Sequence, residues 1–416
     1  MLLDHWHSSQ GWKRRWEDVD LLLLTAPIVL TLIGTVAIFS TDYQSNQTNW
    51  VQHLIMGAVG VGCVWFMKRI QYERLQNWHW IIYGLTNCAL LAVLFFGTRA
   101  LGAERWLNLF GFYLQPSEFA KVSVIISLSA VLKDHPIEHP AHMVRVLAVV
   151  APPMALILLQ PNLGTALVFG AITTGMLYWA GASLGWLILL ISPIVGAILH
   201  NFSLPIWYGW VVGMGITAWM SLPWFRLLAV VLTLVVNLVA GHIGNFLWGL
   251  LHDYQKQRLL LFLDPTQDPL GGGYHLIQSR IAIGSGKLFG KGLLNGTQTQ
   301  LSFIPEQHTD FIFSAIGEEM GFVGCAIVLS LFFLLCCRLL FIANQAKDNF
   351  GSLLSIGVFS FILFQAFVNI GMNIGIAPVT GIPLPWLSYG RSAMIANFLA
   401  IAIVESVVAN RRIIRF

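Results

Sequence analysis

Residues 146–225 read VLAVVAPPMALILLQPNLGTALVFGAITTGMLYWAGASLGWLILLISPIVGAILHNFSLPIWYGWVVGMGITAWMSLPWF. This stretch contains no Asp, Glu, Lys or Arg, and it is long enough for several bilayer crossings of about 20 residues each. The whole chain agrees, because 56% of its 416 residues are hydrophobic and only 10% are charged, against roughly 25% charged in an ordinary soluble domain. The sequence therefore excludes a soluble enzyme and indicates a polytopic integral membrane protein.

Apolar segments of bilayer length recur along the whole chain. The segments predicted to be membrane helices are 21–40, 50–67, 78–98, 115–132, 144–160, 163–181, 184–200, 206–223, 227–251, 310–337, 353–372 and 393–409. Each is close to the length that spans the hydrocarbon layer. The predicted fold class is therefore all-α, with about twelve transmembrane helices in a single membrane domain over residues 21–416, after an N-terminal tail at 1–20.

The distribution of positive charge predicts the orientation in the membrane. With a cytoplasmic N-terminus, most of the 23 Lys and Arg residues fall on the cytoplasmic side, as the positive-inside rule requires. Both termini are then cytoplasmic, and loops 98–117, 252–309 and 373–392 face outside. The large loop 252–309 mixes charged and apolar residues, which predicts an amphipathic segment on the membrane surface. The net charge of +4 is too small and too scattered for a nucleic-acid surface.

Ionisable residues in or beside membrane helices are the first candidates for function, because a charge in the bilayer is costly unless it is paired or hydrated. In the segment 115–121, which reads QPSEFAK, Glu118 and Lys121 lie three residues apart on one face of a predicted helix. They are expected to pair. Two interpretations stay open: a structural ion pair within the bundle, or a cation held by its partner for an anionic substrate group.

A second candidate is the segment 304–310, which reads IPEQHTD and ends where an apolar helix begins. Glu306 and Asp310 lie four residues apart beside His308, a set suited to a general base or to binding a divalent cation. The alternative is that Thr309 or Asp310 caps the following helix by accepting hydrogen bonds from its free amides. From the spacing alone, the cap is the favoured interpretation.

Two further segments combine polarity with membrane depth. Glu318 and Glu319 lie about two turns deeper in the same helix, and because adjacent residues do not share a helix face, they are expected to have different neighbours and a structural role. Loop 375–391 holds three prolines and repeated glycines, which predicts irregular backbone. Membranes tolerate such backbone only when it is buried in protein or lines a cavity. A rigid connector between the last two helices is the alternative.

The chain resembles the SEDS family (shape, elongation, division and sporulation) in six motifs that follow one another in the expected order. They are GAERW at 102–106, QPSEFAK at 115–121, QPNLGT at 160–165, DPTQDPLGGG at 264–273, GTQTQLSFIPEQHTDFIFSAIGEEMG at 296–321 and GIPLPWLSYG at 381–390. The sequence GTQTQL and the short N-terminal tail resemble the elongation members of the family more than the division members.

This resemblance implies a peptidoglycan glycosyltransferase that polymerises lipid II on the outer face of the bacterial cytoplasmic membrane during cell elongation. It implies a class B penicillin-binding protein and other elongation-complex proteins as partners. Asp310 matches the catalytic aspartate, the general base of an inverting reaction that releases undecaprenyl diphosphate. A divalent cation, Mg²⁺ or Mn²⁺, is an additional candidate, and no organic cofactor is expected. The substrate-binding candidates are Glu118, Lys121, Arg105, Glu306, His308, Arg280 and Lys291.

The sequence also departs from the family pattern. Asn162 stands where the family commonly has Asp, and Arg391 stands where it commonly has Gly. Family members usually have about ten helices, so an inserted pair is expected at about 182–226. Two other functions are weighed: a lipid II flippase or transporter, motivated by the many helices and the broken outer loop, and a non-catalytic scaffold of the elongation complex. The charge-free run 146–225 argues against a flippase, which needs polar groups through the membrane thickness.

Overall fold

A computed structural model of the chain describes residues 20–43, 48–100, 103–109, 111–134, 140–221, 226–250, 273–301, 303–304 and 306–410. The predicted tail at 1–20, apart from its last residue, and most of the first half of the loop 252–309 lie outside this part. The long helices are α2 (Leu21–Asp42), α3 (Asn49–Met67), α4 (Glu73–Phe96), α5 (Pro116–Leu132), α6 (Pro140–Leu159), α7 (Leu163–Trp179), α8 (Leu184–Phe202), α9 (Leu204–Ser221), α10 (Arg226–Leu250), α14 (Ile312–Gln345), α15 (Asn349–Ile374) and α16 (Arg391–Ala409).

A helix occupies each of the twelve predicted segments, so the predicted all-α membrane fold class is confirmed. Within the described residues, nine of these helices are long and apolar enough to cross a bilayer, and α7 is a shorter apolar helix. Prolines lie inside α2, α6 and α8, as membrane helices tolerate when neighbouring groups satisfy the freed carbonyls. Two short helices, α12 (Tyr274–Ser285) and α13 (Thr297–Gln300), lie in the predicted outer loop.

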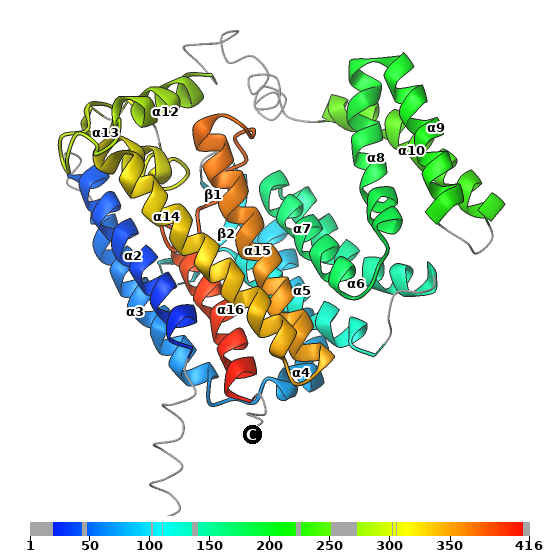
Figure 1. Cartoon of the computed structure of the whole chain (residues 1–416), viewed down its shortest axis with the longest axis horizontal. Coiled ribbons are helices and arrows are strands. Elements are labelled where there is room, and N and C mark those ends of the chain that lie inside the picture. The colour runs from blue at the N-terminus through cyan, green and yellow to red at the C-terminus, as the bar shows by residue number, and fades with distance from the viewer. Residues whose placement is uncertain are drawn as a thin grey trace, which may run out of the picture.

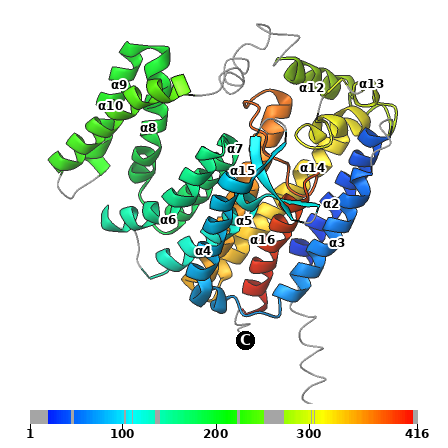
Figure 2. The ribbon, with the colours of Figure 1, turned by 180° about the vertical axis from the view of Figure 1, so that it is seen from behind.

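The segment that follows α4 contains a small sheet, which the sequence analysis did not predict. Strands β1 (Thr98–Ala100), β2 (Ala103–Leu109) and β3 (Phe112–Leu114) form an antiparallel sheet in the order β1-β2-β3. Strands β1 and β3 have only three residues each, and β2, with seven residues reading AERWLNL, does not alternate strictly between apolar and polar residues, so the periodicity of a strand does not stand out in the sequence. The sheet lies across one end of the helix bundle (Figure 2), which we call the cavity end.

The two most central helices are α15 and α16, whose apolar windows are 72% and 78% buried. Around them α14, α2, α3, α5 and α7 form the body of the bundle (Figure 1). The start of α2 and the end of α16 meet at the opposite end, where the backbone amide of Asp20 donates to Glu405 Oε2 at 3.4 Å. There Arg338 Nε also donates to Asp20 Oδ2 at 2.6 Å.

Helices α8, α9 and α10 form a separate three-helix unit at the side of the bundle (Figures 1 and 2). Asn237 of α10 donates to Ser192 Oγ of α8 at 3.0 Å, and Trp210 of α9 donates to the Ser192 carbonyl at 3.2 Å. The unit contacts the remaining helices mainly through α7. It includes the region predicted to hold an inserted helix pair, and that insertion stays a prediction.

Helix α14 is broken at Gly321, whose φ of 67° and ψ of −162° belong to a region that is essentially restricted to glycine. The segment 287–292 fills the break. Phe322 N and Val323 N donate to the Lys287 and Leu288 carbonyls at 2.9 and 3.1 Å. In return, the Glu318 and Glu319 carbonyls accept from Lys291 N and Gly292 N, both at 3.0 Å. The helix hydrogen bonds lost at the break are thus replaced by bonds to the loop.

The carboxylates of Glu318 and Glu319 strengthen this junction. Glu318, fully buried, accepts from Lys291 Nζ at 2.7 Å and from the Thr299 amide at 2.9 Å. Glu319 accepts from Ser40 Oγ of α2 at 2.5 Å. The two acids have different neighbours, as predicted, and their contacts are those of structural residues that tie the outer loop to α14 and α2.

Replacing Gly321 with Ala is expected to destabilise the protein by at least about 1–3 kcal/mol, because the backbone conformation disfavours any side chain. A Cβ there would also lie 2.3 Å from Gly290 N. Thermal unfolding of the purified protein in detergent measures the effect. Gly170→Ala in α7 is the matched control, since its Cβ would meet nothing within 4 Å. Equal melting temperatures for the two variants would contradict the role assigned to the break.

Candidate active site

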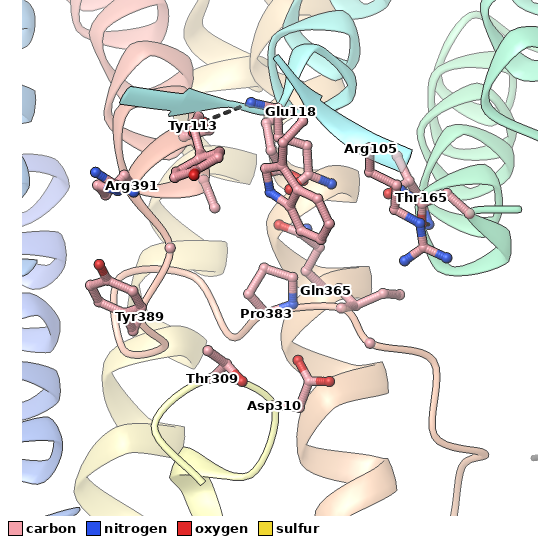
Figure 3. Close-up of a pocket in the computed structure, with 18 of the residues that line it drawn as sticks. Arg105, Tyr113, Glu118, Thr165, Thr309, Asp310, Gln365, Pro383, Tyr389 and Arg391 are labelled. Atoms are coloured by element: carbon pink, nitrogen blue, oxygen red, sulfur yellow. Dashed lines mark hydrogen bonds between the residues drawn. The ribbon is translucent and has the colours of Figure 1, made fainter. Parts of the chain in front are cut away.

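A cavity of ≈ 400 Å³, lined by charged and amide side chains as well as apolar ones, opens at the cavity end of the bundle. Its walls come from the sheet, the starts of α5, α7 and α16, the segment before α14, the middle of α15 and the loop between α15 and α16 (Figure 3). Of the predicted site residues, Arg105, Glu118, Glu306 and Asp310 line it. Segments that lie far apart in the sequence therefore meet in one site.

The loop between α15 and α16 has irregular backbone, as predicted for 375–391, and its second half is mostly buried and lines the cavity, whereas Ile376 in its first half is exposed. Leu384, Trp386 and Leu387 are at most 1% exposed. The loop passes so close to α2 and α7 that a Cβ on Gly34 would lie 2.7 Å from the Leu387 carbonyl oxygen, and one on Gly164 would lie 2.6 Å from that of Thr380. Irregular backbone is tolerated here because it is enclosed by helices and forms one wall of the cavity.

Asp310 is positioned through its backbone by α15. Its carbonyl accepts from Asn369 Nδ2 at 3.0 Å and from Asn373 Nδ2 at 3.1 Å, and both asparagines are fully buried. Asn369 Nδ2 also donates to the Ile382 carbonyl at 2.8 Å, so one amide group links the Asp310 segment to the loop on the other wall. The carboxylate of Asp310 faces the cavity (Figure 3).

The capping interpretation of Thr309 and Asp310 is wrong. Helix α14 begins at Ile312, with Phe311 in the N-cap position and no side-chain cap from that residue. A side chain of another helix takes this role, because Asn373 Oδ1 of α15 accepts from the Ser314 amide at 3.2 Å. Spacing within one segment does not reveal a cap supplied from a neighbouring helix.

Glu118 and Lys121 form the predicted ion pair, with Lys121 Nζ 2.7 Å from Glu118 Oε2. Their side chains are only 3% and 1% exposed. Glu118 lines the cavity, whereas Lys121 lies behind it with its ammonium 4.8 Å from the centre of the Phe361 ring. The lysine therefore neutralises and orients a carboxylate of the cavity wall, and it does not itself line the cavity.

The remaining predicted residues lie in different surroundings. His308 packs its ring against Tyr389, with 5.8 Å between ring centres, and Glu306 is exposed at the rim. Arg280 Nη2 donates to the Gly375 carbonyl at 2.8 Å, and Lys291 pairs with Glu318 at 2.7 Å. Neither Arg280 nor Lys291 lines the cavity. Their predicted role in binding substrate therefore gains no support from their positions.

Two arginines line the cavity. Arg105 of β2 donates to the Gln160 carbonyl at 3.4 Å and also to the Pro161 carbonyl. Arg391, the first residue of α16, lies over the rings of Phe112 and Tyr113, with its guanidinium carbon 5.3 and 5.8 Å from their centres. Asn162 caps α7 by accepting from the Thr165 amide at 3.3 Å, so the residue that departs from the family pattern keeps a local role.

A polar stripe on α15 was missed by the sequence analysis. Gln365, Asn369 and Asn373 follow one another at intervals of four, so they share one helix face. Gln365 lines the cavity and is 1% exposed, and its Oε1 atom has no hydrogen-bond partner among the described residues. Amides at this spacing in an otherwise apolar helix are the signal that would have revealed them.

Few side chains in the cavity could coordinate a divalent cation. In the described part of the chain, no group of three or more His, Cys, Asp and Glu side chains is arranged to hold a metal. Asp310 and Glu306 both line the cavity. Such a pair suits Mg²⁺, which usually keeps several waters and binds one or two carboxylates together with substrate phosphates.

The fold and the cavity define a polytopic membrane protein with a mixed acidic and basic site at one end of its bundle. The family FtsW/RodA/SpoVE, described as "Cell cycle protein", matches residues 19–211 and 206–413. The chain belongs to this family, and the resemblance inferred from the motifs is confirmed.

Relatives with assigned names cover nearly the full chain. The peptidoglycan glycosyltransferase MrdB of Escherichia coli K12 is 35% identical over 97% of both chains. The peptidoglycan glycosyltransferase RodA of Treponema pallidum is 34% identical over 95% of this chain and 98% of its own.

Solved structures show the same fold. A chain described under "Structural coordination of polymerization and crosslinking by a peptidoglycan synthase complex" matches with a TM-score of 0.71 and 26% identity, over 94% of this chain and 97% of its own. The rod shape determining protein RodA of Thermus thermophilus matches with a TM-score of 0.62 and 23% identity, over 94% and 97%.

Replacing Lys121 with Met is expected to destabilise the protein by about 3–5 kcal/mol, because it leaves the Glu118 carboxylate buried without its partner. The double variant Glu118→Gln/Lys121→Met is expected to be more stable than Lys121→Met alone. Thermal unfolding in detergent measures both. The control is Lys133→Met, which breaks the more exposed pair with Asp134 and should change stability by less than about 1 kcal/mol. Strictly additive losses in the double variant would show that the pair is not coupled.

Proposed function

We propose that this protein is a peptidoglycan glycosyltransferase of the elongation type that polymerises lipid II into glycan strands. The observation that carries the proposal is the meeting of Asp310, Glu118 and two arginines in one cavity at the end of a membrane bundle. The near-complete coverage of relatives named peptidoglycan glycosyltransferase supports the same activity.

The chemistry assigns a role to each group. Lipid II joins an apolar tail to its sugars through a diphosphate, so its site needs an apolar approach and cationic groups side by side. Asp310 removes the proton from the acceptor hydroxyl as that oxygen attacks the anomeric carbon of the donor. The bond from this carbon to the diphosphate breaks, which inverts the configuration and releases undecaprenyl diphosphate. Arg105 lines the same cavity and stabilises the charge on the leaving group.

Glu118 and Lys121 act together in this scheme. Because Lys121 is fully buried and paired with Glu118, its charge fixes the orientation of the Glu118 carboxylate on the cavity wall. Glu118 then accepts hydrogen bonds from sugar hydroxyl or amide groups. A Mg²⁺ or Mn²⁺ ion bound by Asp310 and Glu306 would supply further positive charge next to the diphosphate.

Location and partners follow from the same reasoning. The cavity is formed by the loops that positive-inside counting places outside, so we place the site on the outer face of the bacterial cytoplasmic membrane and both termini in the cytoplasm. A class B penicillin-binding protein is the proposed cross-linking partner, supported by the likeness to a chain of a complex described as coordinating polymerisation and cross-linking.

Asp310→Ala is expected to lower the rate of lipid II polymerisation by about 10²–10⁴-fold, the contribution of a general base, while leaving the melting temperature close to that of the parent protein. Gel analysis of labelled glycan strands measures the rate, with and without the partner protein and with Mg²⁺, Mn²⁺ or a chelator. Asp134→Asn, an exposed acid at the opposite end, is the control. Polymer formation by the Asp310→Ala variant at the parent rate would remove this residue from the mechanism. Translocation of lipid II in liposomes by the parent protein, without polymer, would favour a flippase.

The orientation is tested with reporter fusions. A fluorescent protein fused after Phe416 is expected to be bright, and alkaline phosphatase fused at the same place is expected to be inactive, because the C-terminus is cytoplasmic. Alkaline phosphatase inserted at the exposed residue Leu301 is expected to be active. The reverse pattern would place the cavity in the cytoplasm and would exclude an outer-face polymerase.

A further inference from the structure

The two cavity arginines differ in how their hydrogen-bond donors are used. Arg105 already donates to two backbone carbonyls at the turn between α6 and α7. The guanidinium of Arg391 forms no hydrogen bond or ion pair with any residue in the described part of the chain, and its contacts are the rings of Phe112 and Tyr113. Arg391 is therefore the cavity cation whose donors remain available.

The aromatic contacts hold the Arg391 guanidinium without consuming its donors. A cation within about 6 Å of a ring centre is attracted by the ring face. A ring accepts no conventional hydrogen bond from the five N–H donors of a guanidinium, so these donors can still bind a ligand. Figure 3 shows Arg391 beside Tyr113, with Tyr389 and Thr309 on the neighbouring walls.

The backbone adds to the positive charge at the same place. Arg391 is the first residue of α16, and Gly390, Ser392 and Ala393 line the cavity beside it. The first amide groups of a helix have no partner within the helix, and the helix dipole makes this end attractive to anions. The buried Oε1 atom of Gln365, an acceptor in the same cavity with no partner among the described residues, independently indicates a ligand that also brings a hydrogen-bond donor, such as a hydroxyl or amide group of the sugar next to the diphosphate.

We propose that Arg391, together with the first turn of α16, binds the diphosphate of the polyprenyl-linked sugar substrate. The inference rests on the proposed function, and it adds a residue that the family pattern does not contain, because Gly is common at this position in the family that the sequence resembles. A planar guanidinium matches phosphate oxygens with two parallel hydrogen bonds. The role of Arg391 is to position the substrate, and Asp310 keeps the role of base.

The test uses the full-length protein and inorganic pyrophosphate as the probe. Arg391→Gln is expected to raise the KM for lipid II about tenfold, as expected for the loss of a charge-assisted hydrogen bond, with little change in kcat. It is expected to weaken inhibition by pyrophosphate by a similar factor. Arg391→Lys keeps the charge but loses the fork geometry, and it should give intermediate values.

The control is Arg69→Gln at the opposite end, which removes an arginine that also lies over a ring, with its guanidinium carbon 3.7 Å from the centre of Trp65. It is expected to leave the KM and the pyrophosphate inhibition unchanged. If Arg391→Gln does not fold, Arg391→Gly replaces it, since Gly fits the family pattern at this site.

Pyrophosphate is also tested in the absence of turnover, as an increase in the melting temperature of the parent protein that Arg391→Gln reduces. An unchanged KM and unchanged pyrophosphate response in the Arg391 variants would overturn the proposal. The proposal would also be overturned if inhibition by a soluble stem peptide required Arg391 while inhibition by pyrophosphate did not. That result would indicate that Arg391 binds a carboxylate. If the parent protein makes no polymer, the proposed function fails, and the melting experiment still decides whether Arg391 binds diphosphate.

Discussion

The exchange of backbone hydrogen bonds at the break in α14 is the constraint on which the site depends. A membrane helix cannot leave amide and carbonyl groups unpaired, and here the segment 287–292 supplies the missing partners on both sides of Gly321. The loop is thereby fixed to the bundle by its backbone. Glu318 and Glu319 extend the junction to residues 297–300 and to α2.

The position of Asp310 follows from this junction and from α15. Gln307 Nε2 donates to the carbonyls of Thr299 and Thr41 at 3.1 and 3.2 Å, which ties the Asp310 segment to the anchored loop. Asn369 and Asn373 hold the Asp310 carbonyl from the other side. A catalytic group needs a precise position, and buried amides in the rigid centre of the bundle provide it better than a loop alone.

Much of the candidate site was predictable from single segments. The QPSEFAK spacing predicted the Glu118–Lys121 pair, and the apolar residues after Asp310 placed Asp310 at the start of a helix. The cap of α14, however, comes from Asn373 of another helix. Which basic residues line the cavity was not predictable either. Arg280, Lys291 and Arg391 are equally basic in the sequence, but only Arg391 lines the cavity.

The sequence by itself determined the membrane class, the places of the helices and the family, because apolar length and short motifs are local properties of the chain. Only the tertiary structure decided which polar groups share a cavity, that Lys121 lies behind Glu118, and that a loop repairs the break in α14. The physical reason is that these relations depend on how helices distant in sequence pack side by side. The neighbours of a charged side chain in space decide whether it pairs within the protein or can bind a ligand.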